Sequence, residues 1–270
     1  MIKKDYIKSL LDKGTRIDGR KPDQYRDPIS IEYGVSAKSA EGSARVKIGD
    51  TEVIAGVKLD LGTPYSDRPD EGTIMVNVEL LPLSSPLFES GPPSIDSIEL
   101  ARVTDRGIRE CHAIDFKKLC IKKGEKIWMV FVDIYPINAD GNLFDACALA
   151  AMAAIKDARF PKLDEDNNVD YKNRTDDPLP LSKTPISCTV WKLGDKYLID
   201  PLVDEEHAAD ARVTIVFIEN GQICAMQKGK DSEITGKDLK AMVELAEIKQ
   251  QELRKQLKWK KLTQNTKEQE

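Results

Sequence analysis

The sequence predicts an α+β fold, in which mixed sheets carry packed helices. Two blocks of segments alternate apolar and polar residues, the period of half-buried strands, and a helical pattern follows the strands of each block. Gly49-Asp50 and Asn220-Gly221 separate neighbouring strand segments and predict two hairpins. The glycine-rich phosphate-binding motifs of dinucleotide and P-loop folds do not occur, so the pattern excludes a doubly wound nucleotide-binding fold.

An N-terminal arm and the first half of the fold occupy residues 1–161. Residues 4–13 have the pattern of a short helix that ends at Gly14, and the polar, turn-rich segment after it favours an N-terminal helix and extended arm over residues 1–28. Residues 29–161 then form the first half of the domain. In this half we expect a hairpin over 43–61, strands over 72–83 and 126–137, and helices over about 96–111 and 142–158.

A polar segment separates this half from a second one. Residues 162–184 contain Pro, Asn and Asp throughout and are interpreted as a polar linker or surface excursion. Residues 185–258 form the second half, and residues 259–270 are a charged tail that we expect to fray. The elements expected in the second half are hairpins over 185–201 and 212–229 and a long amphipathic helix over 237–258.

Composition indicates a soluble globular protein, with 40% hydrophobic and 32% charged residues. The chain has neither an apolar run of about 18 residues that could span a membrane nor a signal peptide, so we expect a cytoplasmic protein with no membrane partner. Its five cysteines form no Cys-x-x-Cys pair and are expected to be free thiols, and two histidines do not favour a metal site. A net charge of −5 means that any contact with nucleic acid would be local.

One predicted helix carries a stripe of cations. Arg102, Arg106 and Arg109 are spaced i, i+4, i+7, which aligns them along one helical face. The stripe suits a solvated face, in which Asp105 and Glu99 pair some of the arginines. It equally suits binding of a single strand, because guanidinium groups bind phosphate oxygens bidentately. The spacing alone does not decide between these two functions.

Six motifs spread over most of the chain point to a known family. They are RIDGRKPDQYRDP (16–28), GSARVKIGDTEVIAGVK (42–58), NVELLPL (77–83), IELARVTDRGIRE (98–110), VDIYPINADGNLFDACALAAMAA (132–154) and DPLVDEEHAADARV (200–213). In this order and at these intervals they resemble the RNase PH family of phosphorolytic 3′→5′ exoribonucleases, and within it the RNase PH-like subunits of the archaeal exosome. The resemblance implies the RNase PH fold, related to the second domain of ribosomal protein S5, with two βαβα-like halves.

Two positions depart from the active members of that family. Active members have an arginine at the start of the Ala-rich helix, where it and the backbone amides hold the attacking phosphate; here Leu143 follows Gly141 and Asn142. The acidic loop of active members ends in an aspartate that serves acid chemistry or metal binding, and Arg212 stands at that position. The other acids of the loop are Asp200, Glu205 and Glu206, which match the family, and Asp210, which replaces a glutamate.

These departures predict a chain without catalytic or metal-binding residues. Losing one preorganised group costs about 3–4 kcal/mol of transition-state stabilisation, so two losses leave negligible turnover. The same pattern marks the non-catalytic exosome subunit, which the resemblance places in a six-membered ring, three copies alternating with three of the catalytic RNase PH-like subunit. It implies that inorganic phosphate, with or without Mg²⁺, is used by that partner and that this chain has no cofactor of its own. Single-stranded RNA and RNA-binding cap subunits of the exosome are the further partners implied.

The resemblance also gives roles to single residues. Arginines matching Arg102 and Arg106 face the partner's active site and grip RNA phosphates, whereas Arg109 either joins them or pairs with Asp105 or Glu110. For the remaining charged residues we expect structural roles. Arg16, Asp18, Gly19 and Arg20 are assigned to internal or subunit contacts, and Asp204, Glu205 and Glu206 to capping backbone amides or pairing across an interface.

Two other functions remain open from the sequence. The first is a self-sufficient phosphorolytic 3′→5′ exoribonuclease, which would need another cation near Leu143. We expect none there, because Lys156 and Arg159 lie at the far end of that helix. The second is a scaffold protein of the same fold that does not contact RNA. Assembly and activity with the active homologue would distinguish these functions.

Overall fold

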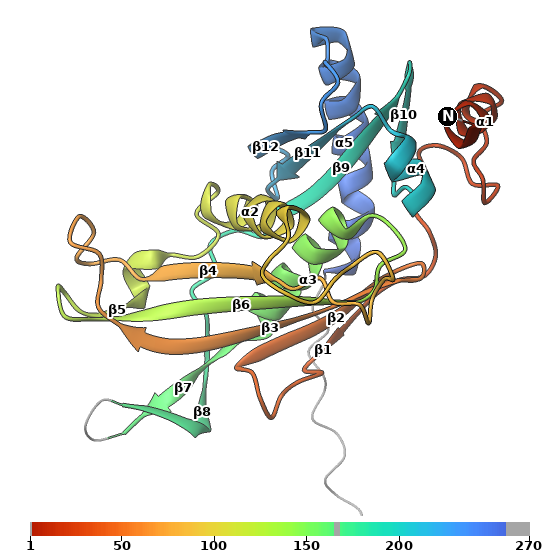
Figure 1. Cartoon of the computed structure of the whole chain (residues 1–270). Helices are drawn as coiled ribbons and strands as arrows, with labels where there is room; N and C mark the ends of the chain where they lie inside the picture. Colours follow the sequence, from red (N-terminus) through yellow and green to blue (C-terminus); the bar gives the residue numbers. More distant parts are fainter. Residues whose placement is uncertain (1, 165–167, 258–270) are drawn as a thin grey trace, which may run out of the picture.

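The computed structural model describes residues 2–164 and 168–257 and has the predicted α+β architecture (Figure 1). Its largest sheet is mixed, with strands in the order β1-β2-β3-β6-β4, and β5 pairs with β6. All pairs in it are antiparallel except β4 with β6. Its strands are β1 (Ile29–Tyr33), β2 (Gly42–Ile48), β3 (Thr51–Gly62), β4 (Thr73–Val78), β5 (Cys120–Lys122) and β6 (Lys126–Asn138).

The second half is a four-stranded antiparallel sheet with strand order β10-β9-β11-β12. Both predicted hairpins, β9 with β10 and β11 with β12, are confirmed. Thr235 caps the long helix α5, and its hydroxyl accepts a hydrogen bond from the Asp238 amide. The elements are β9 (Ile186–Leu193), β10 (Lys196–Ile199), α4 (Val203–Ala208), β11 (Ala211–Phe217), β12 (Ile223–Gly229) and α5 (Gly236–Gln256).

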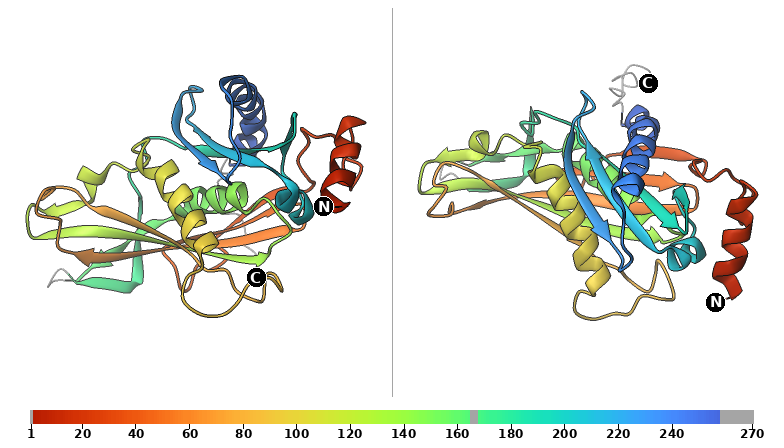
Figure 2. Two further views of the ribbon diagram at one scale, coloured as in Figure 1. Left: turned by 45° about the horizontal axis from the view of Figure 1, so that its top comes forward. Right: turned by 90° about the horizontal axis from the view of Figure 1, so that it is seen from above.

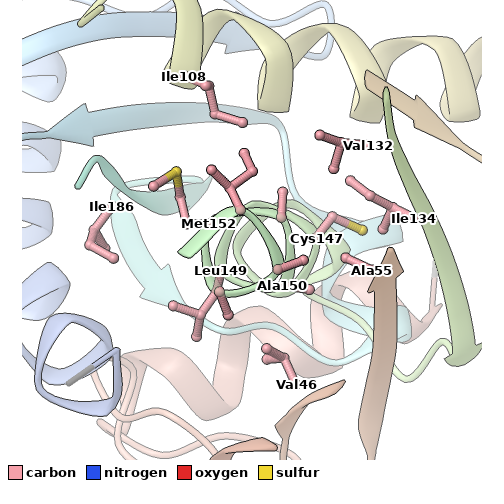
Figure 3. Packing of buried hydrophobic residues seen from close by; sticks show 14 of the residues in the cluster. Val46, Ala55, Ile108, Val132, Ile134, Cys147, Leu149, Ala150, Met152 and Ile186 are labelled. Carbon is pink, nitrogen blue, oxygen red and sulfur yellow. The ribbon is translucent and has the colours of Figure 1, made fainter. Parts of the chain in front are cut away.

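Helix α3 (Leu143–Asp157) is the centre of the core and packs on strands of both large sheets. Its small alanine side chains let the helix approach the strands closely, as Ala150 does beside Val46 and Ala55 (Figure 3). At the closest point, a Cβ on Gly42 of β2 would lie 2.4 Å from the Ala154 carbonyl oxygen. A larger residue at position 42 would therefore push the helix off the sheet.

Two further helices lie outside this core. Helix α2 (Ile95–Arg109) begins at Ser94, whose hydroxyl accepts a hydrogen bond from the Ser97 amide, and it packs on β4 and α3. Leu100, Val103 and Ile108 are buried, so the opposite face of α2 carries the arginines. Helix α1 (Ile2–Asp12) lies at one edge of the molecule beside α4 (Figure 2). Within the described residues, no helix combines the length and apolar character that crossing a membrane requires.

The segment predicted as a polar linker or surface excursion, residues 162–184, contains regular structure. β7 (Arg159–Leu163) and β8 (Val169–Pro178) form a two-stranded antiparallel sheet that extends below the large sheet in Figure 1. The end of the segment then bonds to the first half, where the Ser182 amide donates to the Ala113 carbonyl. Sequence patterns did not reveal these strands because polar residues such as Asp170 and Asn173 interrupt them, although Phe160, Leu163 and Val169 pack against the core. The predicted tail, 259–270, lies outside the described residues.

Candidate functional site

The acidic loop, residues 200–212, connects β10 to β11 and contains α4. Asp200 is fully buried, and its carboxylate receives Arg26 Nη2 at 2.8 Å and Arg20 Nη1 at 3.0 Å. Glu205 is also buried, pairs with the buried Arg16 through Nε at 3.0 Å, and accepts the Leu202 amide at 2.9 Å. Burying a carboxylate is tolerable only with such partners. The carboxylates of Asp200 and Glu205 are therefore paired with arginines of the same chain.

The outer acids of the loop pair with the N-terminal helix. Asp204 lies 3.1 Å from the Lys3 ammonium, and Asp210 lies 2.5 Å from that of Lys4 and accepts the Gly194 amide at 2.7 Å. Of the three acids predicted to cap backbone amides or pair across an interface, Glu205 accepts an amide, and Asp204 makes a surface ion pair within the chain. Asp210, for which no capping role was predicted, accepts an amide as well.

The side chain of Glu206, a residue of α4, lies at the start of α3. One of its carboxyl oxygens accepts the Asn142 backbone amide at 2.7 Å. Asn142 caps the helix in the left-handed region, with φ 55°, and Gly141 before it approaches the acidic loop so closely that a Cβ there would lie 2.2 Å from the Pro201 carbonyl oxygen. Burial of the carboxyl raises the pKa of Glu206 to about 7. A carboxyl group of the chain itself thus caps the end of α3 that would attract an anion.

Arg212 is locked in place by packing. It is 3% exposed, its guanidinium carbon lies 3.7 Å from the centroid of the Phe144 ring, and Nη2 pairs with Glu99 at 2.5 Å. On its other side a Cβ on Gly229 would lie 2.4 Å from the guanidinium carbon. The cation that replaces the family's aspartate therefore holds α2, α3 and β11 together.

Leu143 and Arg212, the two departures predicted from the sequence, line one pocket of 250 Å³, together with Phe144, Glu206 and Trp191. Lys230 also lines this pocket, so the expectation that no other cation lies near Leu143 was wrong. The ammonium of Lys230 donates to the Ala209 carbonyl at 3.0 Å and to the Glu206 carbonyl. Sequence reasoning missed it because the residue is distant in the chain and is brought close by the β11-β12 pairing.

The arginine groove lies between α2 and β4, has a volume of 610 Å³, and is lined by Arg102, Arg106 and Arg109. All three predicted residues thus lie together, but their states differ. Arg102 and Arg106 are exposed; Arg106 is 3.7 Å from Glu110, and Arg102 has no ion-pair or hydrogen-bond partner among the residues that the structure describes. Two charges of the stripe are therefore available to a ligand.

Arg109 is committed to the fold. Its guanidinium donates to both carboxylate oxygens of Asp105, at 2.8 and 3.0 Å, and to the Ile74 carbonyl at 2.8 Å. The hydrogen bond to Asp105 raises the pKa of Arg109. Of the two alternatives for this residue, pairing with Asp105 is the one found.

Arg26 is a structural residue that sequence reasoning did not single out. Besides Asp200, its guanidinium contacts the Asp140 carboxylate at 2.9 Å, the Thr51 hydroxyl at 3.2 Å and the Gly141 carbonyl at 3.1 Å. The only signal for this role in the sequence was the position of Arg26 within the motif RIDGRKPDQYRDP (16–28). Within residues 2–164 and 168–257, no group of three or more His, Cys, Asp and Glu side chains is arranged to hold a metal ion.

This fold, with its two sheets around an Ala-rich helix and an acidic loop at the start of that helix, belongs to a known class. Two family models match the chain: the 3′ exoribonuclease family, domain 1, over residues 24–161, and domain 2 of the same family over residues 183–249. The chain is therefore a member of the 3′ exoribonuclease, or RNase PH, family.

Among curated relatives, the chain is 48% identical to exosome complex component Rrp42 of Methanocella arvoryzae over 95% of both chains, and 50% identical to Rrp42 of Archaeoglobus fulgidus over 84% of this chain and 85% of that one. Its fold matches a solved structure of the Archaeoglobus fulgidus exosome with RNA bound to the active site, with a TM-score of 0.87, 45% identity, and coverage of 95% of this chain and 98% of that chain. Rice Rrp46, 19% identical with a TM-score of 0.67 and coverage of 90% and 98%, shares the fold.

Proposed function

We propose that this chain is the non-catalytic, RNA-binding subunit of an archaeal exosome ring, which supports phosphate-dependent 3′→5′ RNA degradation by a catalytic partner. One observation carries the proposal: the backbone amide at the start of α3 is capped by the chain's own Glu206, with Leu143 beside it. An incoming phosphate would have to displace this carboxyl group and would find no arginine at position 143. The second departure, Arg212, places a cation where active members have an aspartate, and it stacks on Phe144 and pairs through Nη2 with Glu99.

The role in RNA binding rests on the arginine groove. Arg102 and Arg106 are exposed on one face of α2, one turn apart, in a groove of 610 Å³. Phosphates of a single strand are bound through such guanidinium groups without regard to base sequence. The A. fulgidus relative of this fold belongs to an assembly in which RNA is bound.

The partners follow from the same proposal. In the ring this chain alternates with the catalytic RNase PH-like subunit, three copies of each, and cap subunits bind RNA above it. Leu83, Leu87 and Ile95 are more than half exposed, which supports a protein interface that includes them. Of the three, Leu87 lines a neighbouring groove that shares Asn77 and Ser97 with the arginine groove. Inorganic phosphate and any Mg²⁺ are then used at the partner's site.

Phosphorolysis assays test the proposal directly. The purified chain is expected to release no nucleoside diphosphates from poly(A) in the presence of inorganic phosphate, whereas the ring reconstituted with the active homologue releases them. The Leu143→Arg variant is a control that tests whether the missing arginine alone inactivates the pocket. We expect this variant also to be inactive without the partner. Phosphorolysis by the isolated wild-type chain would overturn the proposal.

The self-sufficient enzyme is a second candidate because Lys230 lines the same pocket as Leu143. We consider it weaker, since the Lys230 ammonium already donates to two backbone carbonyls and the family's acid is replaced by Arg212. Were the isolated chain active, Lys230→Ala should abolish that activity, and the exposed Lys240→Ala should leave it intact. Activity retained in Lys230→Ala would point to a contaminating nuclease.

A further inference from the structure

Two cysteines that are far apart in the sequence converge on one backbone carbonyl. Cys111 follows the end of α2, and Cys224 lies in the edge strand β12. Their sulfur atoms lie 3.3 Å and 4.0 Å, respectively, from the carbonyl oxygen of Gly107. Neither residue takes part in the acidic loop or the arginine groove, so this thiol pair has no role in the function proposed above.

The two thiols differ in access to solvent. Cys111 is buried and Cys224 is half-buried at the molecular surface. The ammonium of Lys183 lies at the same place, since it donates to the Cys111 carbonyl at 2.8 Å. The neighbouring Cys111 thiol, followed by backbone donors and Lys183, lowers the pKa of Cys224, while the Cys224 thiol and burial raise the pKa of Cys111. The accessible sulfur is therefore the one that favours the thiolate.

We propose that Cys111 and Cys224 form an oxidation site at which a peroxide produces an intramolecular disulfide. The Cys224 thiolate attacks one peroxide oxygen, the O–O bond breaks, and hydroxide leaves, so Cys224 becomes a sulfenic acid. The Cys111 sulfur then attacks that of Cys224, the S–O bond breaks, and water leaves with the Cys111 proton. Two thiols and one hydrogen peroxide thus give one disulfide and two waters.

The bond would connect the end of α2 to the second sheet. Gly107 already lies in contact with that sheet, since a Cβ there would meet Val216 at 3.4 Å, so the disulfide forms without separating the elements. It closes the chain between positions 111 and 224, which restricts the unfolded state and raises the melting temperature. Helix α2, which carries Arg102 and Arg106, would be fixed at its C-terminal end.

Peroxide treatment of the purified full-length protein tests this site. The chain has five cysteines, so titration of thiols after denaturation should fall from five to three, and dithiothreitol should restore five. Peptide mapping should find Cys111 joined to Cys224. The non-reduced, oxidised protein should melt at a higher temperature than the reduced protein.

Three variants make the outcome decisive. Cys111→Ser should stop at the Cys224 sulfenic acid, which dimedone traps, and Cys224→Ser should keep all four remaining thiols. Cys120→Ser, which removes a half-buried cysteine on β5, should still lose two thiols and form the Cys111–Cys224 bond. Five thiols remaining in the wild type, or disulfides that join two chains through Cys120 or Cys224, would overturn the proposal and leave the pair as packing residues of the core.

Discussion

The acidic loop and the arginine groove both involve arginines and carboxylates, but these charges are paired in the first region and partly unpaired in the second. The inner carboxylates of the acidic loop are buried against arginines of the N-terminal arm, as Glu205 is against Arg16, with no exposed side-chain surface. In the arginine groove Arg102 is exposed and free of partners among the described residues. A buried charge must be paired within the chain, while an exposed one can wait for a ligand at little cost. The comparison teaches that the availability of charges, and not their number, distinguishes the surface that we propose to bind RNA.

The largest effect is expected where the acidic loop is broken. Arg16→Ala leaves the Glu205 carboxylate buried without its cation, and losing one partner of a buried pair costs about 3–5 kcal/mol. Urea unfolding followed by circular dichroism should show this loss in the free energy of unfolding. As a matched control, Lys3→Ala removes an exposed pair with Asp204 and should cost less than about 1 kcal/mol. Equal effects from the two variants would contradict the distinction between buried charges that must be paired and exposed charges that need no partner.

The next effect is the pH dependence of Glu206, whose pKa is raised to about 7 by burial. The folded state binds the proton more tightly than the unfolded chain does, so stability is fully present at acid pH and is lost as the pH rises through about 7. The Glu206→Gln variant removes this contribution. Between about pH 5 and pH 8 its free energy of unfolding should fall less than that of the wild type, by up to about 3 kcal/mol.

Chemical denaturation across that pH range measures the difference. Asp145, a buried neighbour in α3 whose pKa is likewise raised to about 7, chiefly by burial, gives a parallel test, because Asp145→Asn should flatten the profile in the same direction. If Glu206→Gln keeps the wild-type profile, burial does not raise the pKa of the Glu206 carboxyl as described.

The smallest effect on the fold, and the sharpest on function, concerns the arginine groove. Arg102→Glu with Arg106→Glu should leave the free energy of unfolding nearly unchanged and weaken RNA binding by the assembled ring about ten-fold or more. The slope of the logarithm of affinity against the logarithm of salt concentration should become shallower by about 0.7 per lost phosphate contact. Fluorescence anisotropy of a labelled oligonucleotide at several salt concentrations measures both quantities.

Arg109→Ala and Lys240→Glu are the controls for that experiment. Arg109 is engaged with Asp105 and Ile74, so its loss should cost about 1 kcal/mol of stability and leave the salt slope as it is. Lys240→Glu reverses an exposed charge on α5 and should change neither quantity. An unchanged slope in the double variant would make the stripe a solvated face.

Much of the fold could be predicted because its signals are local. The helices α2 and α3 and the hairpins of β2 with β3 and of β11 with β12 follow from periodicity, capping residues and two-residue turns, all within a few positions of each other. The alignment of Arg102, Arg106 and Arg109 likewise follows from the helical repeat alone. The family motifs then indicated which fold contains these elements.

Only the tertiary structure decided which charged side chains are paired within the chain. Arg16 and Glu205 are 189 positions apart, Glu206 meets an amide 64 positions away, and Lys230 comes beside Leu143 only through the pairing of β11 with β12. The sequence likewise did not reveal the exposed two-stranded sheet of β7 and β8. Each of these strands is regular because it pairs with the other, and not because of its own composition. A side chain's type and spacing are written in the sequence, but its burial and its partner depend on contacts that only the folded chain creates.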